Sequence, residues 1–167
     1  MNGMHQYGMD AEVAAMAVSG LLVSAVVPAA IHATRHRAVW SRLSVPAAAA
    51  LPGFAALHAV IALAGQRGDS LVTHVLLEML LLGGAVLFWL PVLGERHRLS
   101  DPARSVYLYL AMPLLDLPGV AMVALGHVAG GLAMITAMLP IGLAALRITW
   151  RWVTTEERLA QAQLPGE

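Results

Sequence analysis

Two long stretches of this sequence carry almost no charge, and they limit what the chain can fold into. No Asp, Glu, Lys or Arg lies between Arg42 and Arg67, and Asp116 is the only one between Arg104 and Arg147. A helix crosses the hydrocarbon core of a bilayer with about 20 apolar residues, and there only helices and closed barrels satisfy their backbone hydrogen bonds. Charged residues make up 12% of the chain, against about 25% in soluble domains. We therefore predict an all-α, polytopic membrane bundle that forms one domain.

Five hydrophobic segments, separated by charged or turn-forming residues, predict five transmembrane helices. We place them at residues 12–32, 43–65, 70–93, 103–125 and 128–153, with tails at 1–11 and 154–167. Asp101 and Pro102 are typical of the residues that begin a helix. The dipeptide Gly126-His127 is typical of a tight turn between two helices.

The distribution of arginine predicts the orientation of the bundle. All 10 basic residues are Arg. If the N-terminus is outside, only Arg67 lies outside and every other arginine lies inside, as the positive-inside rule requires. We therefore expect an external N-terminus and a cytoplasmic C-terminus. The tryptophans then fall at the inner interface, where aromatic anchors are common: Trp40, Trp89, Trp150 and Trp152.

Several classes of function find no support in the composition. The chain has no Cys, which excludes disulfides, thiolate metal sites and thiol chemistry. Its formal net charge is zero, so nothing indicates nucleic-acid binding. It has no phosphate loop and no Ser/His/Asp grouping, so we do not expect an enzyme. The first residues lack a basic leader, and we expect the first helix to act as its own signal anchor.

Polar and thioether side chains gather toward the predicted outer face. His74 and Glu78 lie four residues apart near the start of the third helix, so they share one face. Imidazole and thioether groups suit Cu(I), and an ionisable group inside the membrane is by default a functional hypothesis. The metal-ligand candidates come from the predicted helices, the turn after the fourth helix and the N-terminal tail: His58, His74, Glu78, Asp116, Met112, His127, Met4, His5 and Met9.

Each of these signals also has a structural explanation. His58 can be a hydrogen-bonded histidine of the bundle, and the pair His74 and Glu78 can stabilise the start of its helix. A protonated Asp116 can bond a carbonyl that a nearby proline leaves free. Methionines in apolar helices more often pack than bind. The shared location of these groups on one side of the bundle is what favours a metal site.

A series of short motifs runs through residues 57–159. They are His74-x-x-x-Glu78, Phe88-Trp89-x-Pro91-Val92-Leu93-Gly94, Arg98-Leu99-Ser100-x-Pro102-Ala103-Arg104, Leu108-Tyr109-Leu110-Ala111-Met112-Pro113, Gly131-Leu132-Ala133-Met134, and Arg151-Trp152 to Glu157-Arg158. Together, in this order, they resemble the CtaG-type cytochrome c oxidase assembly family of bacterial membrane proteins. The chain looks like a short and divergent member, because members of that family usually have more helices.

The resemblance implies a protein of the bacterial plasma membrane that delivers copper to a terminal oxidase. The expected ligand is copper, with Cu(I) favoured, and the expected partner is a haem-copper oxidase or another cuproprotein. His58 resembles a histidine that lies late in the corresponding helix of the family. His74 resembles the first of two histidines spaced by four, and here Glu78 stands at the second position.

Two other classes of function stay open. The chain can be a small structural subunit or assembly scaffold of a respiratory complex, since the glycine pairs at 83–84 and 130–131 suit close helix packing. It can also be a b-type haem protein, which needs two axial imidazoles that face each other, such as His58 with His74 or His127. The sequence does not predict the oligomeric state.

Overall fold

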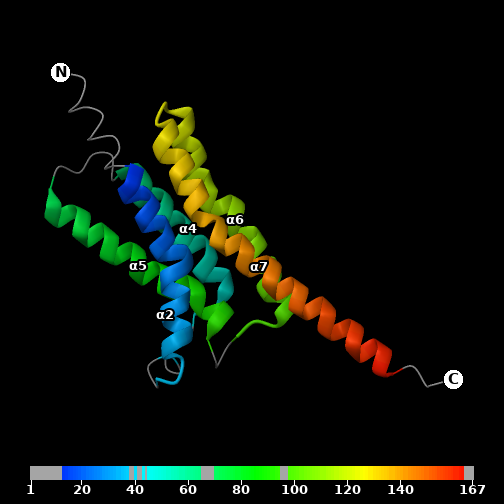
Figure 1. The fold of residues 1–167 in the computed structure, drawn as a ribbon. Helices are drawn as coiled ribbons and strands as arrows, with labels where there is room; N and C mark the ends of the chain where they lie inside the picture. The colour runs from blue at the N-terminus through cyan, green and yellow to red at the C-terminus, as the bar shows by residue number, and fades with distance from the viewer. Residues whose placement is uncertain are drawn as a thin grey trace.

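The computed structural model describes residues 13–37, 40, 43, 45–64, 70–94 and 98–163, and they form a bundle of helices (Figure 1). The first helix, Val13–Thr34, contains a π-helical turn η1 (Leu22–Val26) and continues as α2 (Val27–Thr34). The elements that follow are α4 (Ala47–Ala64), α5 (Leu71–Leu93), α6 (Asp101–Ala124) and α7 (Val128–Ala162). No strand occurs among the described residues, so the all-α prediction is confirmed.

Four helices are long and apolar enough to cross a membrane, namely the first helix, α5, α6 and α7. The fifth apolar helix, α4, has 18 residues and begins later than the predicted start at Leu43. Its start follows Pro46, whose carbonyl accepts the N–H groups of Ala49 and Ala50. At 1.5 Å per residue, α4 is about 27 Å long, close to the thickness of a hydrocarbon core.

The last two helices begin or end at other residues than predicted. α6 begins at Asp101 rather than at residue 103, with Ser100 as its N-cap. Pro102 fits inside the first turn because the N–H groups there have no helical partner in any case. α7 continues to Ala162 rather than ending at Val153, since Glu, Arg, Leu, Ala and Gln after that point are good helix formers.

α6 and α7 form an antiparallel hairpin that is closed by a glycine turn. Gly126 has a φ of 95°, which glycine adopts at little cost. Its N–H donates to the carbonyl of Val123 over 3.1 Å, and the N–H of His127 donates to the carbonyl of Met122 over 2.9 Å. This pair of bonds is the Schellman arrangement. The predicted tight turn at Gly126-His127 is confirmed.

Glycines also let the two helices of this hairpin approach closely. A Cβ atom added to Gly131 would lie 2.5 Å from the carbonyl oxygen of Gly119 and 2.7 Å from Cγ2 of Val123. A Cβ atom added to Gly119 would lie 3.0 Å from the carbonyl oxygen of Gly131. The two backbones are therefore in contact at this level, as is common where small residues meet between membrane helices.

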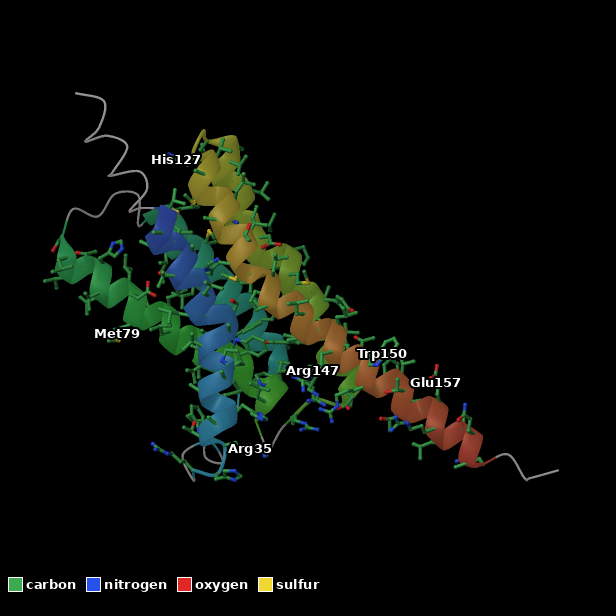
Figure 2. All side chains as sticks on the ribbon, in the orientation of Figure 1. Arg35, Met79, His127, Arg147, Trp150 and Glu157 are labelled. Carbon is green, nitrogen blue, oxygen red and sulfur yellow. The ribbon has the colours of Figure 1, made fainter. Side chains whose placement is uncertain are left out.

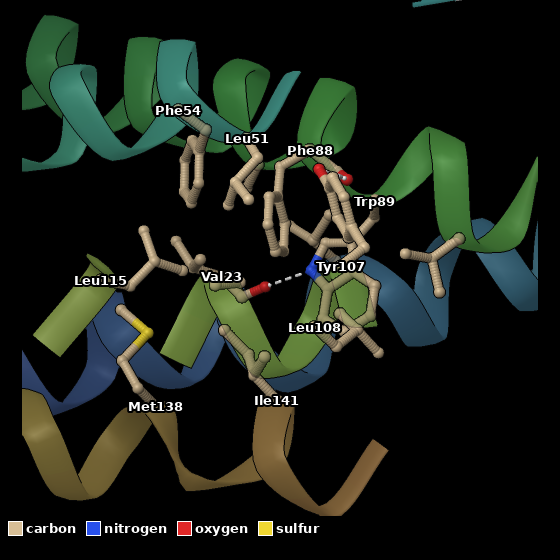
Figure 3. Packing of buried hydrophobic residues seen from close by; sticks show 14 of the residues in the cluster. Val23, Leu51, Phe54, Phe88, Trp89, Tyr107, Leu108, Leu115, Met138 and Ile141 are labelled. Atoms are coloured by element: carbon tan, nitrogen blue, oxygen red, sulfur yellow. Dashed lines mark hydrogen bonds between the residues drawn. The ribbon is translucent and has the colours of Figure 1, made fainter. Parts of the chain in front are cut away.

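The aromatic core lies at the C-terminal half of α5 (Figure 3). The ring of Phe88 lies 5.1 Å from that of Phe54 in α4 and 5.4 Å from that of Tyr107 in α6. The hydroxyl of Tyr107 donates to the carbonyl of Phe88 over 2.9 Å. Trp89 is 2% exposed, whereas Trp150 is 70% exposed. The prediction that Trp89 is an interfacial anchor is therefore wrong, because its indole is enclosed by the bundle.

The indole of Trp89 completes the backbone bonding of the first helix. In the π-helical turn the N–H of Val27 donates to the carbonyl of Leu22, so it is not available to the carbonyl of Val23. The next N–H in the π register would belong to Pro28, which has none. The Nε1–H of Trp89 donates to the carbonyl of Val23 instead, over 2.9 Å (Figure 3).

Two segments lie partly away from the packed centre. The N-terminal half of α5 diverges from the hairpin of α6 and α7, and the C-terminal end of α7 extends beyond the other helices (Figure 1). Leu71, Val72 and Met79 in α5 are each at least 66% exposed, as expected for side chains that face lipid. The divergence of α5 leaves space between it, the first helix and α4.

Candidate functional site

The space beside the N-terminal half of α5 is a cavity of about 440 Å³. We call it the His58 cavity. All five helices contribute to its wall, and it lies in the half of the bundle that carries the turn at His127, labelled in Figure 2. Its lining combines small and apolar residues with one imidazole pair, one carboxylate and three thioethers: Ala15, Met16, Ser19, Gly20, His58, Ile61, Ala62, His74, Leu77, Glu78, Leu81, Met122 and Met134.

His58 is the most enclosed polar group of this wall. The residue is 4% exposed, and its ring stacks on Phe54, one turn earlier in α4, with 6.0 Å between the centroids. The backbone of Leu115 is within reach of the imidazole as a weak hydrogen-bond partner, although neither ring nitrogen makes a hydrogen bond of good geometry with a described residue. A buried polar group without a partner costs about 1–3 kcal/mol. At least one ring nitrogen of His58 is therefore available to a ligand.

Glu78 lies across the cavity on α5 and is only half satisfied. The hydroxyl of Ser19 in the first helix donates to its Oε2 over 2.8 Å. Its Oε1 is buried and has no partner among the described residues. His74 lies one turn earlier on the same face of α5, and it lines the same cavity although the residue is exposed. Three of the candidate ligands, on two helices, therefore border one space.

Three methionines complete the donor set of the cavity. Met16 belongs to the first helix, Met122 to α6 and Met134 to α7. The first two converge where Gly130 has no side chain, since a Cβ atom there would lie 2.8 Å from Sδ of Met16 and 3.4 Å from Cε of Met122. The candidate set from the sequence omits all three residues. In the sequence, Met16 shares one face of the first helix with Ser19 and Gly20, and Met134 ends one of the family-like motifs, but nothing there shows that the three thioethers border one cavity.

The other predicted ligands that the structure describes do not line the His58 cavity. Sδ and Cε of Met112 occupy the position of a side chain on Gly142, at 2.9 Å and 2.7 Å from a Cβ atom built there. Asp116 is half-buried, with Oδ1 unpaired among the described residues, and it does not line the cavity. His127 is exposed in the glycine turn. Met4, His5 and Met9 lie outside the described residues.

The arrangement limits which metal sites are possible. Within the described part of the chain, no three His, Cys, Asp or Glu side chains come close enough to hold one ion. A site in the His58 cavity would therefore need thioether ligands beside the imidazole. That donor set is soft, and it suits Cu(I) better than Zn²⁺ or Mg²⁺.

Comparison with known proteins adds no relative. No protein-family model, curated protein or solved structure matches the chain. What the protein does is therefore inferred from the contents of the cavity and from the placement of charge around the bundle.

Proposed function

We propose that the chain crosses a bacterial plasma membrane five times, with its N-terminus outside and its C-terminus in the cytoplasm. Support comes from the two ends of the bundle. Arg35 and Arg147 lie at the end opposite the turn at His127 (Figure 2), and basic residues favour the cytoplasmic side. α4 is the shortest of the five helices, but its length of about 27 Å still approaches that of a hydrocarbon core. In this orientation the His58 cavity faces the outer leaflet.

We propose further that the His58 cavity binds Cu(I). The observation that carries this proposal is the buried imidazole of His58, which makes no hydrogen bond of good geometry with a described residue and faces a cavity that also contains three thioethers. A neutral imidazole and neutral thioethers enter an apolar cavity at a lower cost than carboxylates do. Binding of a soft ion would satisfy the imidazole. His74 and Glu78 would receive the ion where α5 diverges and pass it inward.

The bound copper would be cargo for a cuproenzyme at the outer face, such as a cytochrome oxidase. This step rests on the likeness of the loop and α6 motifs to the oxidase assembly family. Transfer would proceed by exchange of ligands, in which a thioether or imidazole of the acceptor replaces one from this chain, and no covalent bond changes. Thioethers fit such a role because they bind without a proton to lose, so exchange does not depend on proton release.

Copper retention tests the proposal. The full chain, purified in detergent and loaded with Cu(I), is expected to retain copper, and His58→Ala is expected to lower the affinity at least ~10–100-fold, the loss that even an outer-shell partner of a metal causes. The double variant Met16→Leu/Met122→Leu should show a similar loss, while its packing is nearly conserved, since exchange of Met for Leu usually costs less than about 1.5 kcal/mol. Metal content and competition with a chromogenic chelator measure both effects.

A histidine at the other end of the bundle gives the matched control. His36 is exposed and does not line the cavity, so His36→Ala should retain copper as the unchanged chain does. The proposal is wrong if the unchanged chain holds no copper after loading, or if the His58 and His36 variants retain equal amounts.

A second candidate function is that of a structural subunit or scaffold of a respiratory complex without a metal. Close packing favours it: a Cβ atom on Gly84 would lie 2.6 Å from Cδ2 of Leu57, so this glycine joins α5 to α4. A scaffold tolerates loss of the cavity's polar groups but not of its helix contacts. For a scaffold, copper-dependent oxidase activity in cells should survive His58→Ala and be lost with Gly84→Leu. Copper delivery predicts instead that His58→Ala lowers this activity.

A further inference from the structure

A second cavity, of about 720 Å³, lies at the opposite end of the bundle from the turn at His127. We call it the arginine cavity. The first helix, α5, α6, α7 and the stretch before α6 line it. Its basic residues are His32, Arg35, Arg98, Arg104, Arg147 and Arg151. The described residues of this lining include no Asp or Glu.

The positive charge of the arginine cavity is poorly balanced. Among the described residues, the only ion pairs of these arginines go to Asp101, which pairs with Arg104 and, over 3.8 Å, with Arg98. Arg98 and Arg151 both act on Arg104 with like charge. Arg104 is only 8% exposed, and its Nε is buried with no hydrogen-bond partner in the described part of the chain. Like charges held together in this way favour an anion between them.

Arginine at this position favours a phosphate in particular. The planar guanidinium offers paired N–H donors that match the oxygens of a phosphate. One of these guanidinium groups is already fixed, because Arg104 donates to the carbonyl of Val92 over 3.4 Å and to Asp101. Arg35, Arg147 and Arg151 are exposed. Arg35 directly follows the first helix and the other two belong to α7, so they can close on an anion from two sides.

The other wall of the cavity is apolar. It includes Val92, Leu93 and Ile148. On other faces of α7, Leu143 is 66% exposed and Leu146 is 58% exposed, which is the exposure expected where a helix faces acyl chains. A free anion gains nothing from apolar surface at its side. A lipid gains from both walls, since its phosphate meets the arginines while an acyl chain follows the helices.

We propose that the arginine cavity binds a phosphate group, and that this group is the phosphodiester headgroup of an acidic phospholipid. The lipid would fill the space between the first helix and α7 and would hold these two helices together at this end. The proposal is independent of copper, because it concerns other residues at the opposite end of the bundle.

Native mass spectrometry of the full chain in detergent tests this proposal, with phosphatidylglycerol as the acidic lipid and phosphatidylcholine as the neutral one. We expect tighter binding of phosphatidylglycerol. Each arginine near a membrane surface contributes about five-fold to the binding of acidic lipid, so Arg147→Gln/Arg151→Gln should weaken it about 25-fold. Arg158→Gln is the matched control, since it removes one charge from the same helix at a residue that does not line the cavity.

Every outcome of this experiment bears on the proposal. Equal binding of both lipids, or equal losses in the double variant and in Arg158→Gln, would overturn it. Displacement of phosphatidylglycerol by an equal concentration of inorganic phosphate would assign the cavity to a soluble phosphate compound and overturn the lipid. If the double variant does not fold, Arg147→Lys/Arg151→Lys and a salt titration replace it. Added salt should weaken binding of phosphatidylglycerol to the unchanged chain but should not weaken binding of phosphatidylcholine. If salt affects both lipids equally, the proposal is contradicted.

Discussion

Gly131→Ala is expected to lower the free energy of unfolding of the bundle by about 3 kcal/mol, near the upper end of the cost of overpacking a core. The new Cβ atom would lie 2.5 Å from the carbonyl oxygen of Gly119. The obstacle is backbone rather than the end of a flexible side chain, so the clash is relieved only if α6 and α7 move apart. Thermal unfolding in detergent, followed by far-UV circular dichroism, should show a midpoint lower by roughly 10 °C.

Gly83→Ala provides the matched control for this prediction. Gly83 also lies inside an apolar helix, but a Cβ atom there meets nothing within 4 Å. Alanine is the better helix former by about 1 kcal/mol, so this variant should be as stable as the unchanged chain or slightly more stable. Equal midpoints for the two variants would mean that the contact between α6 and α7 yields at no cost, and they would contradict the prediction.

Trp89→Phe is expected to destabilise the bundle by about 3 kcal/mol, because the carbonyl of Val23 then stays buried without a donor. The loss of the indole also leaves unfilled volume among side chains that are fully buried, which adds to the cost. Trp150→Phe is the control, since Trp150 is 70% exposed and surface substitutions usually change stability by less than about 0.5 kcal/mol. Thermal unfolding of both variants measures the difference.

A double-mutant cycle separates the hydrogen bond of Trp89 from its packing. Pro28→Ala supplies the N–H that the π register lacks, so the carbonyl of Val23 gains a donor within its own helix. Trp89→Phe should therefore cost less in the Pro28→Ala background than in the unchanged chain, by about 1 kcal/mol, the usual net value of one hydrogen bond. Equal costs in the two backgrounds would show that the indole contributes packing alone.

Much of the fold can be predicted from the sequence because the uncharged, hydrophobic stretches coincide so closely with the helices. The uncharged stretches after Arg42 and Arg104 indicate helices at nearly the right positions. The glycine turn at Gly126 is also predictable, since its φ of 95° demands glycine. The C-terminal end of α7 at Ala162 cannot be predicted from hydropathy, because this polar segment is stabilised by helix propensity rather than by burial.

The candidate site is harder to predict because it depends on the rotation of each helix. Successive residues of a helix are turned by about 100°, so a residue near the right depth can still face away. Met112 faces Gly142, whereas Met122 faces the His58 cavity. From the sequence, Met112 and Met122 both read as packing residues of an apolar helix. Only the structure distinguishes Met122, because it converges with Met16 at Gly130.

The role of Trp89 could be inferred only in part. The presence of Pro28 indicates that a carbonyl in the preceding turn lacks its N–H donor. The sequence does not indicate which side chain provides the replacement donor. A tryptophan near the end of a hydrophobic segment is ordinarily interpreted as an interfacial anchor. The structure places this one inside the bundle, with its N–H on the carbonyl of Val23.

The bond between Trp89 and Val23 also has a consequence for the order in which the bundle is completed during synthesis. Val23 is synthesised early, and the residue that pairs with it appears 66 positions later. Lipid offers no water to take the place of that donor in the meantime. A nascent chain that stops short of residue 89 therefore has a first helix with one carbonyl still unpaired, and the middle of the protein completes that helix when it arrives.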